Sequence, residues 1–382
     1  MSDSVKRRIR TRPIEAEVWP QARVSVVVPC YNYAHFLPDA VSSALSQKDV
    51  DVDVIVVDDA STDESAEVAK SLASSDPRVR IIENQTNMGP VGTFNNGLGE
   101  VTGEFIVRLD ADDMLTPGSL ARSVALAHEF PSVGLVYGHP VHFIESEQAA
   151  GKNRGWGKPV TIAPGATPPY RSTARSWTVW PGRAWLRDRC RTGLNVITSP
   201  EVLMRASVVD CVGGQRNLPH THDMEMWLRI ASVSDVGHVR GADQAWHREH
   251  PRSLSTALTG SINQWQAQQL AFDTLFEGVS DALPEYAQLH DISRRAVAKG
   301  ILREACHSYD RGRAEPDDVA AAEGYALELY PEATALWTWR ALQRRKLIQD
   351  RIPVNRTPYI GAGAAHRLMF EHRARRWKRD GI

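Results

Sequence analysis

The chain has 382 residues, of which 42% are apolar and 24% are charged, as is usual for a folded globular protein. Lys and Arg (45) nearly balance Asp and Glu (46), so the overall charge does not indicate a nucleic-acid-binding protein. The four cysteines lie far apart without a CxxC pair, which argues against a disulfide framework or a cysteine zinc site. No run of about 18 apolar residues indicates a membrane span, and no apolar segment follows the charged start. We expect a cytoplasmic protein.

Alternating strands and helices are predicted after a polar, Arg-rich extension over residues 1–22. The β-branched run VSVVVP (24–29) indicates a strand buried on both faces. Further elements follow at a spacing typical of βαβ units: a helix at 37–45, a strand at 53–59, a helix at 61–74, a strand at 79–84, a helix within 87–103 and a strand at 104–110. The pattern predicts an α/β fold with a mostly parallel sheet.

The periodicity fades after residue 138, and residues 145–182 are expected to form a loop or lid. A helix at 185–191, an extended segment at 195–204 and a helix at 224–231 follow. From about residue 260 the composition is helical. We therefore divide the chain into an N-terminal extension (1–22), a catalytic domain (23–258) and a C-terminal helical region with a basic tail (259–382).

Two acidic clusters lie at the predicted carboxyl ends of strands, which we expect to be neighbours in the sheet. Ligands of such sheets bind beyond these ends. If the chain turns after its strand, Asp110 and Asp112 can converge on a divalent cation such as Mg²⁺ or Mn²⁺. These acids could equally cap the helix that starts near Pro117. Asp58 and Asp59 have the same two interpretations: they could bind a base or ribose, or cap the next helix.

Successive segments of the chain resemble the motifs of family 2 glycosyltransferases. The N-terminal motifs are VSVVVPCYNYAHFL, DVIVVDDASTDES and NMGPVGTFNNGLGEVTGEFIVRLDADD, and the downstream ones are NVITSPEVLMRASVVDCVGG, HTHDMEMWLRIA and WHREHPRSLS. The resemblance covers roughly residues 23–255, with the motifs in the family's order. It implies the glycosyltransferase A fold, a nucleotide-diphosphate sugar donor and inversion at the anomeric carbon.

The resemblance also implies a role for each matching residue. Asp59 matches a uracil-binding aspartate, Asp110 and Asp112 match the two acids of a DxD metal motif, and His250 matches a histidine that helps to hold the metal or diphosphate. Asp223 matches the catalytic base. The remaining expected contacts to the nucleotide sugar are Pro29, Tyr31, Asn87, Arg108 and Ala111, together with Asp110 itself.

An inverting displacement needs one base within reach of the acceptor hydroxyl, and this is the role implied for Asp223. The alternative is that Asp223 only stabilises the start of a helix. The neighbouring His220 and His222 could touch the acceptor or metal, although we favour solvated side chains. Trp180 and Trp227 are mild candidates for sugar stacking.

The sequence departs from the family pattern in the helix after the third strand. The family usually has Ala-Arg-Asn where this chain has Thr93, Phe94 and Asn95. Arg108, an unusual charge in an otherwise apolar strand, either replaces the missing arginine or only pairs with a nearby acid.

The last 46 residues are strongly basic. Residues 337–382 contain ten Arg and two Lys against three acids, a net charge of about +9. Such a segment could contact an anionic membrane at its inner face, form a homodimer contact or present a solvated surface.

We expect a metal-dependent (Mn²⁺ or Mg²⁺) glycosyltransferase that moves a sugar, with UDP as the expected nucleotide, to a saccharide, glycolipid or small-molecule acceptor in envelope polysaccharide or glycoconjugate synthesis. A sugar nucleotidyltransferase and an inactive scaffold of the same fold are the alternatives. The first lacks its usual Gly-rich basic loop here, and the retained acids speak against the second. Donor and acceptor specificity is expected within residues 140–195.

Overall fold

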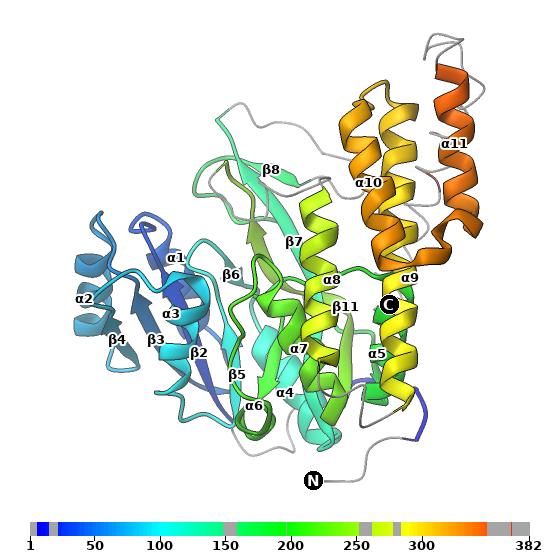
Figure 1. Ribbon diagram of the computed structural model, residues 1–382. Helices are drawn as coiled ribbons and strands as arrows, with labels where there is room; N and C mark the ends of the chain where they lie inside the picture. The colour runs from blue at the N-terminus through cyan, green and yellow to red at the C-terminus, as the bar shows by residue number, and fades with distance from the viewer. Residues whose placement is uncertain are drawn as a thin grey trace.

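The structure is a computed structural model that describes residues 6–14, 22–147, 159–195, 197–251, 262–277, 284–349 and 368. Within these residues, eleven strands form one sheet with helices on both sides (Figure 1). The strands are β1 (Ile9–Thr11), β2 (Arg23–Cys30), β3 (Asp51–Asp58), β4 (Val79–Glu83), β5 (Phe105–Arg108), β6 (Met114–Leu115), β7 (Val133–Glu145), β8 (Val160–Ile162), β9 (Ser176–Trp180), β10 (Leu203–Arg205) and β11 (Asp235–Arg248).

The helices alternate with strands up to β11 and then follow one another. Those of the first part are α1 (Leu37–Leu45), α2 (Ser65–Ser75), α3 (Gly89–Leu98), α4 (Ser119–Glu129), α5 (Gly182–Thr192), α6 (Ala206–Val212) and α7 (His222–Val233). The C-terminal helices are α8 (Ile262–Phe276), α9 (Pro284–Asp310), α10 (Pro316–Leu329), the short 3₁₀ helix η3 (Pro331–Ala335) and α11 (Trp337–Gln349).

The strand directions bring several carboxyl ends to one edge of the sheet. The order is β1-β9-β11-β7-β10-β5-β2-β3-β4. Strands β5, β2, β3 and β4 are parallel. Strand β10 is antiparallel to both β5 and β7, so β7 runs in the same direction as β5, and β11 is parallel to β7. The residues that follow β2, β3, β5 and β11 therefore meet at one edge.

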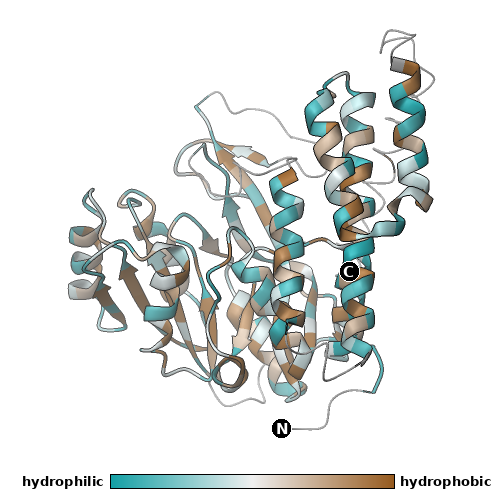
Figure 2. Cartoon of the chain, viewed as in Figure 1, coloured by the Kyte–Doolittle hydropathy of each residue, from teal (hydrophilic) through white to brown (hydrophobic). Residues whose placement is uncertain are grey.

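Alternation along the central strands divides the core into two layers. Val26 and Val28 of β2 pack in the layer that contains α1 and α4. Val27 points to the opposite layer, which contains Phe94 of α3 and Trp227 of α7. Figure 2 shows these strands in brown, with helices that are more hydrophilic around them. This pattern is what a sheet covered on both faces requires.

The predicted α/β fold and the helical C-terminal region are confirmed, with four local differences. The two acidic clusters are not on adjacent strands, because β2 lies between β3 and β5. Residues 1–22 were predicted to be an extension outside the catalytic domain, but Ile9–Thr11 pairs with β9 of the sheet. The prediction of a loop or lid over residues 145–182 is wrong in part, because strands β8 and β9 lie within this range. Residues 235–248 form a long strand that we did not predict.

The basic C-terminal segment is only partly described. In α11, Arg345 binds Asp310 of α9 at 2.8 Å, and Lys346 binds Glu323 of α10 at 2.8 Å. These cations therefore hold the helices together. Residues 350–367 and 369–382 lie outside the described part of the chain, as does most of the predicted basic tail. None of the helices that the structure describes is long and apolar enough to cross a membrane.

Candidate active site

The acidic segment after β5 turns back on itself, as its metal-binding interpretation requires. The backbone N–H of Asp113 donates to the carbonyl of Asp110 at 2.9 Å, with residues 111 and 112 in the turn. Ala111 is buried beneath this turn, whereas the Asp110 side chain is 33% exposed. The turn thus directs the carboxylate of Asp110 towards solvent at the carboxyl edge of the sheet.

The end of β11 holds this turn in place. The carboxylate of Asp113, which is fully buried, accepts from the backbone N–H of Arg248 at 2.9 Å and contacts Nδ1 of His247 at 3.0 Å. Arg248 also donates from Nε to the carbonyl of Asp112 at 3.0 Å. Burial alone would lower the pKa of His247, but Asp113 outweighs it and raises the pKa to about 10. His247 is therefore a cation, and it compensates the buried Asp113.

His250 follows β11 and reaches the same turn. Its Nε2 lies 2.9 Å from Oδ2 of Asp112, and both side chains are largely buried. Among the described residues, no group of three or more His, Cys, Asp or Glu side chains is placed to hold a metal ion. The pair still fits a cation such as Mn²⁺ or Mg²⁺, because these ions complete their coordination with water and substrate phosphate oxygens.

Arg108 connects the acidic turn to the rest of the site. The buried guanidinium donates from Nε to Oδ1 of Asp110 at 2.9 Å and from Nη1 to Oε1 of Gln215 at 2.5 Å. It also lies 5.3 Å from the centre of the Phe94 ring. The guanidinium of Arg108 thus lies over the ring of Phe94, the residue that stands where the family usually has an arginine.

A loop before α7 presents Gln215 to Arg108. Asn95 of α3 holds Gln215 through two hydrogen bonds to its backbone, each 2.8 Å long. Arg229 of α7 donates to the carbonyls of Gly213 and Gly214, and Glu225 fixes its guanidinium at 2.9 Å. The loop is therefore fastened both to α3 and to the helix that carries the predicted base.

Asp223 lies in the first turn of α7 and is partly buried. Burial raises its pKa to about 7. Proximity to Asp110 adds to the rise, while the Met224 N–H and the charge of Arg108 oppose it. Burial and Arg108 also lower the pKa of the neighbouring His222 to about 4, so this imidazole is neutral at pH 7. Asp223 and the acidic turn are thus close enough to act on each other's charge.

Asp59 follows β3 and holds the loop before α3. Its buried carboxylate accepts from Nδ2 of Asn84 at 2.8 Å and from the backbone N–H groups of Met88 and Gly89 at 2.7 and 2.9 Å. The side chain of Asn87 accepts from the same Gly89 N–H at 3.1 Å. A carboxylate has about four acceptor positions, so three internal bonds leave Asp59 room for one further donor.

The loops after β2 and β3 are interlocked. Asn32, which has a left-handed backbone (φ 59°), accepts from the N–H of Thr62 at 2.8 Å, and its own N–H donates to the hydroxyl of Ser61 at 3.0 Å. Pro29 is half-buried at the end of β2, whereas Tyr31 is 44% exposed. The Tyr31 ring is therefore available to a ligand at this edge.

Most of the predicted residues thus lie along one edge of the sheet. The structure brings Arg108, Asp110, Asp112 and His250 into a connected cluster and places Asp223 within electrostatic reach of it. Trp180 and Trp227 are core residues, 4% exposed each, which contradicts a sugar-stacking role. Sequence reasoning gave no role to Asp113, His247, Arg248 or Gln215. The first three stand within recognised motifs, whereas no local signal marks Gln215.

Comparison with known sequences agrees with this architecture. Residues 25–184 match the model of glycosyl transferase family 2. An uncharacterized glycosyltransferase of Haemophilus influenzae is 34% identical over 214 residues, 55% of this chain and 60% of the relative. The GalNAc(5)-diNAcBac-PP-undecaprenol beta-1,3-glucosyltransferase of Campylobacter jejuni is 38% identical over 108 residues, 28% of this chain and 35% of the relative. The matches therefore span less than two thirds of each relative.

Solved structures extend the likeness to the C-terminal region. S. aureus TarS 1-349 in complex with UDP-GlcNAc aligns with a TM-score of 0.56 at 15% identity, over 85% of this chain and 89% of that one. The mannosyltransferase PcManGT of Pyrobaculum calidifontis, in complex with GDP-Man and Mn²⁺, aligns with a TM-score of 0.51 at 18% identity, over 90% of each chain. The predicted glycosyltransferase A fold is thereby confirmed. The expected resemblance to family 2 glycosyltransferases is thus confirmed over residues 25–184, the part of the chain that matches the family model.

Proposed function

We propose that this protein transfers a sugar from a nucleotide-diphosphate donor, specifically a UDP-sugar, to an acceptor hydroxyl with inversion at the anomeric carbon. The observation that carries the proposal is the gathering of Asp110, Asp112 and Asp223 from two separate segments at one edge of the sheet. A relative named as a glucosyltransferase, together with structural neighbours that are bound to UDP-GlcNAc and to GDP-Man, supports the donor class.

Asp223 is the proposed base. Its pKa of about 7 matches the task, because about half of the carboxyl groups are ionised at pH 7 and the carboxylate is basic enough to accept a proton efficiently. The acceptor hydroxyl would donate a hydrogen bond to Asp223 and lose its proton to it as the oxygen bonds to the anomeric carbon. The bond between that carbon and the nucleoside diphosphate breaks in the same displacement. Attack on the face opposite the leaving group gives inversion.

Asp112 and His250 are the proposed protein ligands of a divalent cation, with Asp110 beside them. When bound, Mn²⁺ or Mg²⁺ would neutralise the departing diphosphate. Arg108 acts here as a positioning residue, because its Nε fixes Oδ1 of Asp110 at 2.9 Å. The residues proposed to contact the nucleotide lie around the ends of β2, β3, β4 and β5: Pro29, Tyr31, Asp59, Asn87 and Ala111.

A decisive first test screens UDP- and GDP-sugars for thermal stabilisation of the protein with and without Mn²⁺. We expect one UDP-sugar to raise Tm by several degrees only with the metal, and Asp112→Asn to abolish that dependence. Asp210→Asn, on the exposed side of α6, is the matched control and should behave as wild type. NMR of the transfer product would then report the anomeric configuration. Failure of all nucleotide sugars to bind or be hydrolysed would favour an inactive scaffold.

The setting of this activity is part of the proposal. We propose polysaccharide or glycolipid synthesis at the cytoplasmic face of a membrane, because one relative is named for a saccharide on PP-undecaprenol. The basic segment 337–382 would supply the membrane contact or a homodimer contact. If the intact chain does not sediment with anionic liposomes, the membrane contact is wrong.

A further inference from the structure

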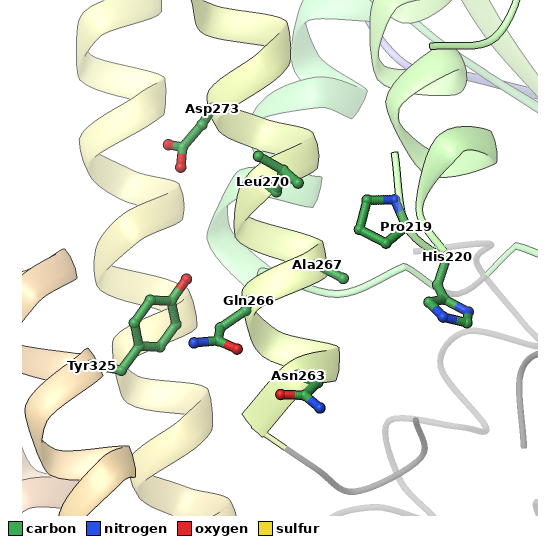
Figure 3. Close-up of a pocket in the computed structure, with 8 residues that line it drawn as sticks. All are labelled: Pro219, His220, Asn263, Gln266, Ala267, Leu270, Asp273 and Tyr325. Atoms are coloured by element: carbon green, nitrogen blue, oxygen red, sulfur yellow. The ribbon is translucent and has the colours of Figure 1, made fainter. Parts of the chain in front are cut away.

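A pocket lies between the loop that leads into α7 and helices α8 and α10 (Figure 3). Its volume is about 510 Å³, within the ~300–1,000 Å³ range of small-molecule sites. In Figure 3, Pro219 and His220 stand on one side of it and side chains of α8 on the other, with Tyr325 of α10 beyond them. No role described above uses this space, which we name the α8 pocket.

Hydrogen bonds connect helix α8, which lines the α8 pocket, to the segment that carries the proposed base Asp223. The hydroxyl of Thr221, next to His220, donates to the carbonyl of Ala267 on α8 at 2.9 Å, and this bond is buried. On the same side, Arg216 donates from Nη1 to the carbonyl of Thr274 at 2.9 Å. Asp223 follows Thr221 by only two residues. A ligand in the pocket therefore lies against a wall whose position relative to Asp223 is fixed.

His220 reaches the pocket through an unusual backbone conformation. Its φ of 61° lies in the left-handed region, which is sterically unfavourable for residues other than glycine. Conformations of this kind persist where the surrounding structure enforces them, and they cluster at binding sites. Here the turn lets Pro219 and His220 form the wall that faces α8 (Figure 3).

The lining offers neutral hydrogen-bonding groups beside small apolar surfaces. Asn263 and Gln266 present exposed side-chain amides from successive turns of α8, and Leu270 continues the same face. Each amide has two donors and an acceptor oxygen, which suits pairs of hydroxyl groups. Burial raises the pKa of Tyr325 to about 12, so its hydroxyl stays protonated and can donate.

The charge of the lining argues against an anionic ligand. None of the described residues that line the α8 pocket is Lys or Arg. Its acid, Asp273, is engaged by Gln269 at 2.8 Å and His290 at 2.5 Å, and Arg294 lies 3.7 Å from it. The guanidinium of Arg294 is thus already paired with Asp273, so a phosphate or carboxylate placed here would meet this acid without a Lys or Arg among the described lining residues to balance it. A neutral polyhydroxylated ring meets neither difficulty.

We infer that the α8 pocket binds the acceptor as a neutral saccharide and directs one of its hydroxyl groups towards Asp223. This inference rests on the proposed glycosyl transfer and adds the acceptor's chemical class and its binding place. The C-terminal helices then supply one side of the acceptor site, while the sheet edge holds the donor.

The test is saturation-transfer NMR on the full chain with methyl β-glucoside and methyl β-N-acetylglucosaminide, and glucose 6-phosphate as the anionic counter-probe. We expect at least one neutral glycoside to bind and the phosphate to bind at least about tenfold more weakly. Gln266→Ala and Tyr325→Phe should each weaken the neutral glycoside by about tenfold, the loss of one good hydrogen bond. Gln264→Ala, on the same helix but outside the pocket, is the matched control and should keep wild-type affinity.

The inference is overturned if neither glycoside binds, if the variants and the control bind equally, or if glucose 6-phosphate binds as tightly as the glycosides. Binding of UDP with Mn²⁺ is measured on the same samples and should be unchanged in all three variants. If the wild-type protein does not bind UDP, the proposed function is contradicted. If it binds UDP but no glycoside, only the acceptor role of the α8 pocket is contradicted.

Discussion

The carboxylates of the acidic turn each have an Arg or His partner, whereas the carboxylate of Asp223 has no ion-pair partner among the described residues. Arg108, His250 and His247 contact Asp110, Asp112 and Asp113 at 2.9, 2.9 and 3.0 Å. Asp223 accepts from the backbone N–H of Met224 at 2.5 Å. Paired charges keep a fixed geometry, and a partly buried unpaired carboxylate keeps a high proton affinity. The same residue type can thus serve two tasks through its surroundings alone.

The largest expected effect comes from removing the unpaired carboxylate. Asp223→Asn should lower kcat by about 10²–10⁴-fold, because a general base contributes that much, and leave nucleotide binding unchanged. Steady-state kinetics with the donor found by thermal screening, together with calorimetric titration of UDP, would measure both. Asp210→Asn serves again as the control. Normal turnover of the Asp223→Asn protein would assign the base to another residue.

The raised pKa of Asp223 predicts an acid limb in the pH profile. Turnover should fall about tenfold for each pH unit below about 7, as the base becomes protonated.

Stability should change with pH in the opposite direction. The carboxyl of Asp223 binds its proton more tightly in the folded than in the unfolded protein, so its contribution to the free energy of unfolding decreases as the pH rises from about 4 to 7. Asp223→Asn should therefore gain Tm relative to wild type at pH 8 but not at pH 4. A profile flat from pH 5 to 8 would contradict the assignment.

A smaller effect is expected from Arg108, which links the paired carboxylates to the loop before α7. Arg108→Ala leaves Asp110 and Gln215 without their partner, and we expect about tenfold weaker binding of UDP with Mn²⁺. Arg122→Ala is the matched control. It removes a guanidinium of α4 that donates to Gln244 at 2.8 Å and takes no part in the proposed site. Both variants should lose stability, but only the first should lose affinity. Equal UDP affinity in the two would make Arg108 purely structural.

The sequence predicted the elements whose apolar pattern is nearly continuous. Most buried positions of β2 and β3 are Val or Ile, with Ser25 and Asp53 as a buried polar pair, so the strands and the acids at their ends were evident. The outcome was different for β11, where Asp243, Gln244 and Arg248 are buried. Asp243, for example, is held by His139 and Arg171, residues about 70 to 100 positions away. Such distant partners make a polar residue suitable for the core, and a local pattern cannot reveal them.

The candidate site shows the same limit. Its acids and His250 were found because they stand in motifs with a fixed spacing. Gln215 lies 107 residues from Arg108, and only the fold brings the two side chains together. Phe94 was recognised as a departure from the family pattern, but the guanidinium of Arg108 over its ring required coordinates. Residues that hold the reacting groups are therefore harder to predict than the reacting groups themselves.

The short strand β1 has a protective consequence. Ile9, Arg10 and Thr11 pair with Val179, Thr178 and Trp177, and so cover the outer edge of β9, all of whose residues are buried. Without that cover, an aromatic-rich segment would present unpaired N–H and C=O groups to any passing extended chain, the usual starting point of edge-to-edge aggregation. Removal of Ile9–Thr11 would therefore expose the edge of β9 to pairing with strands of other molecules.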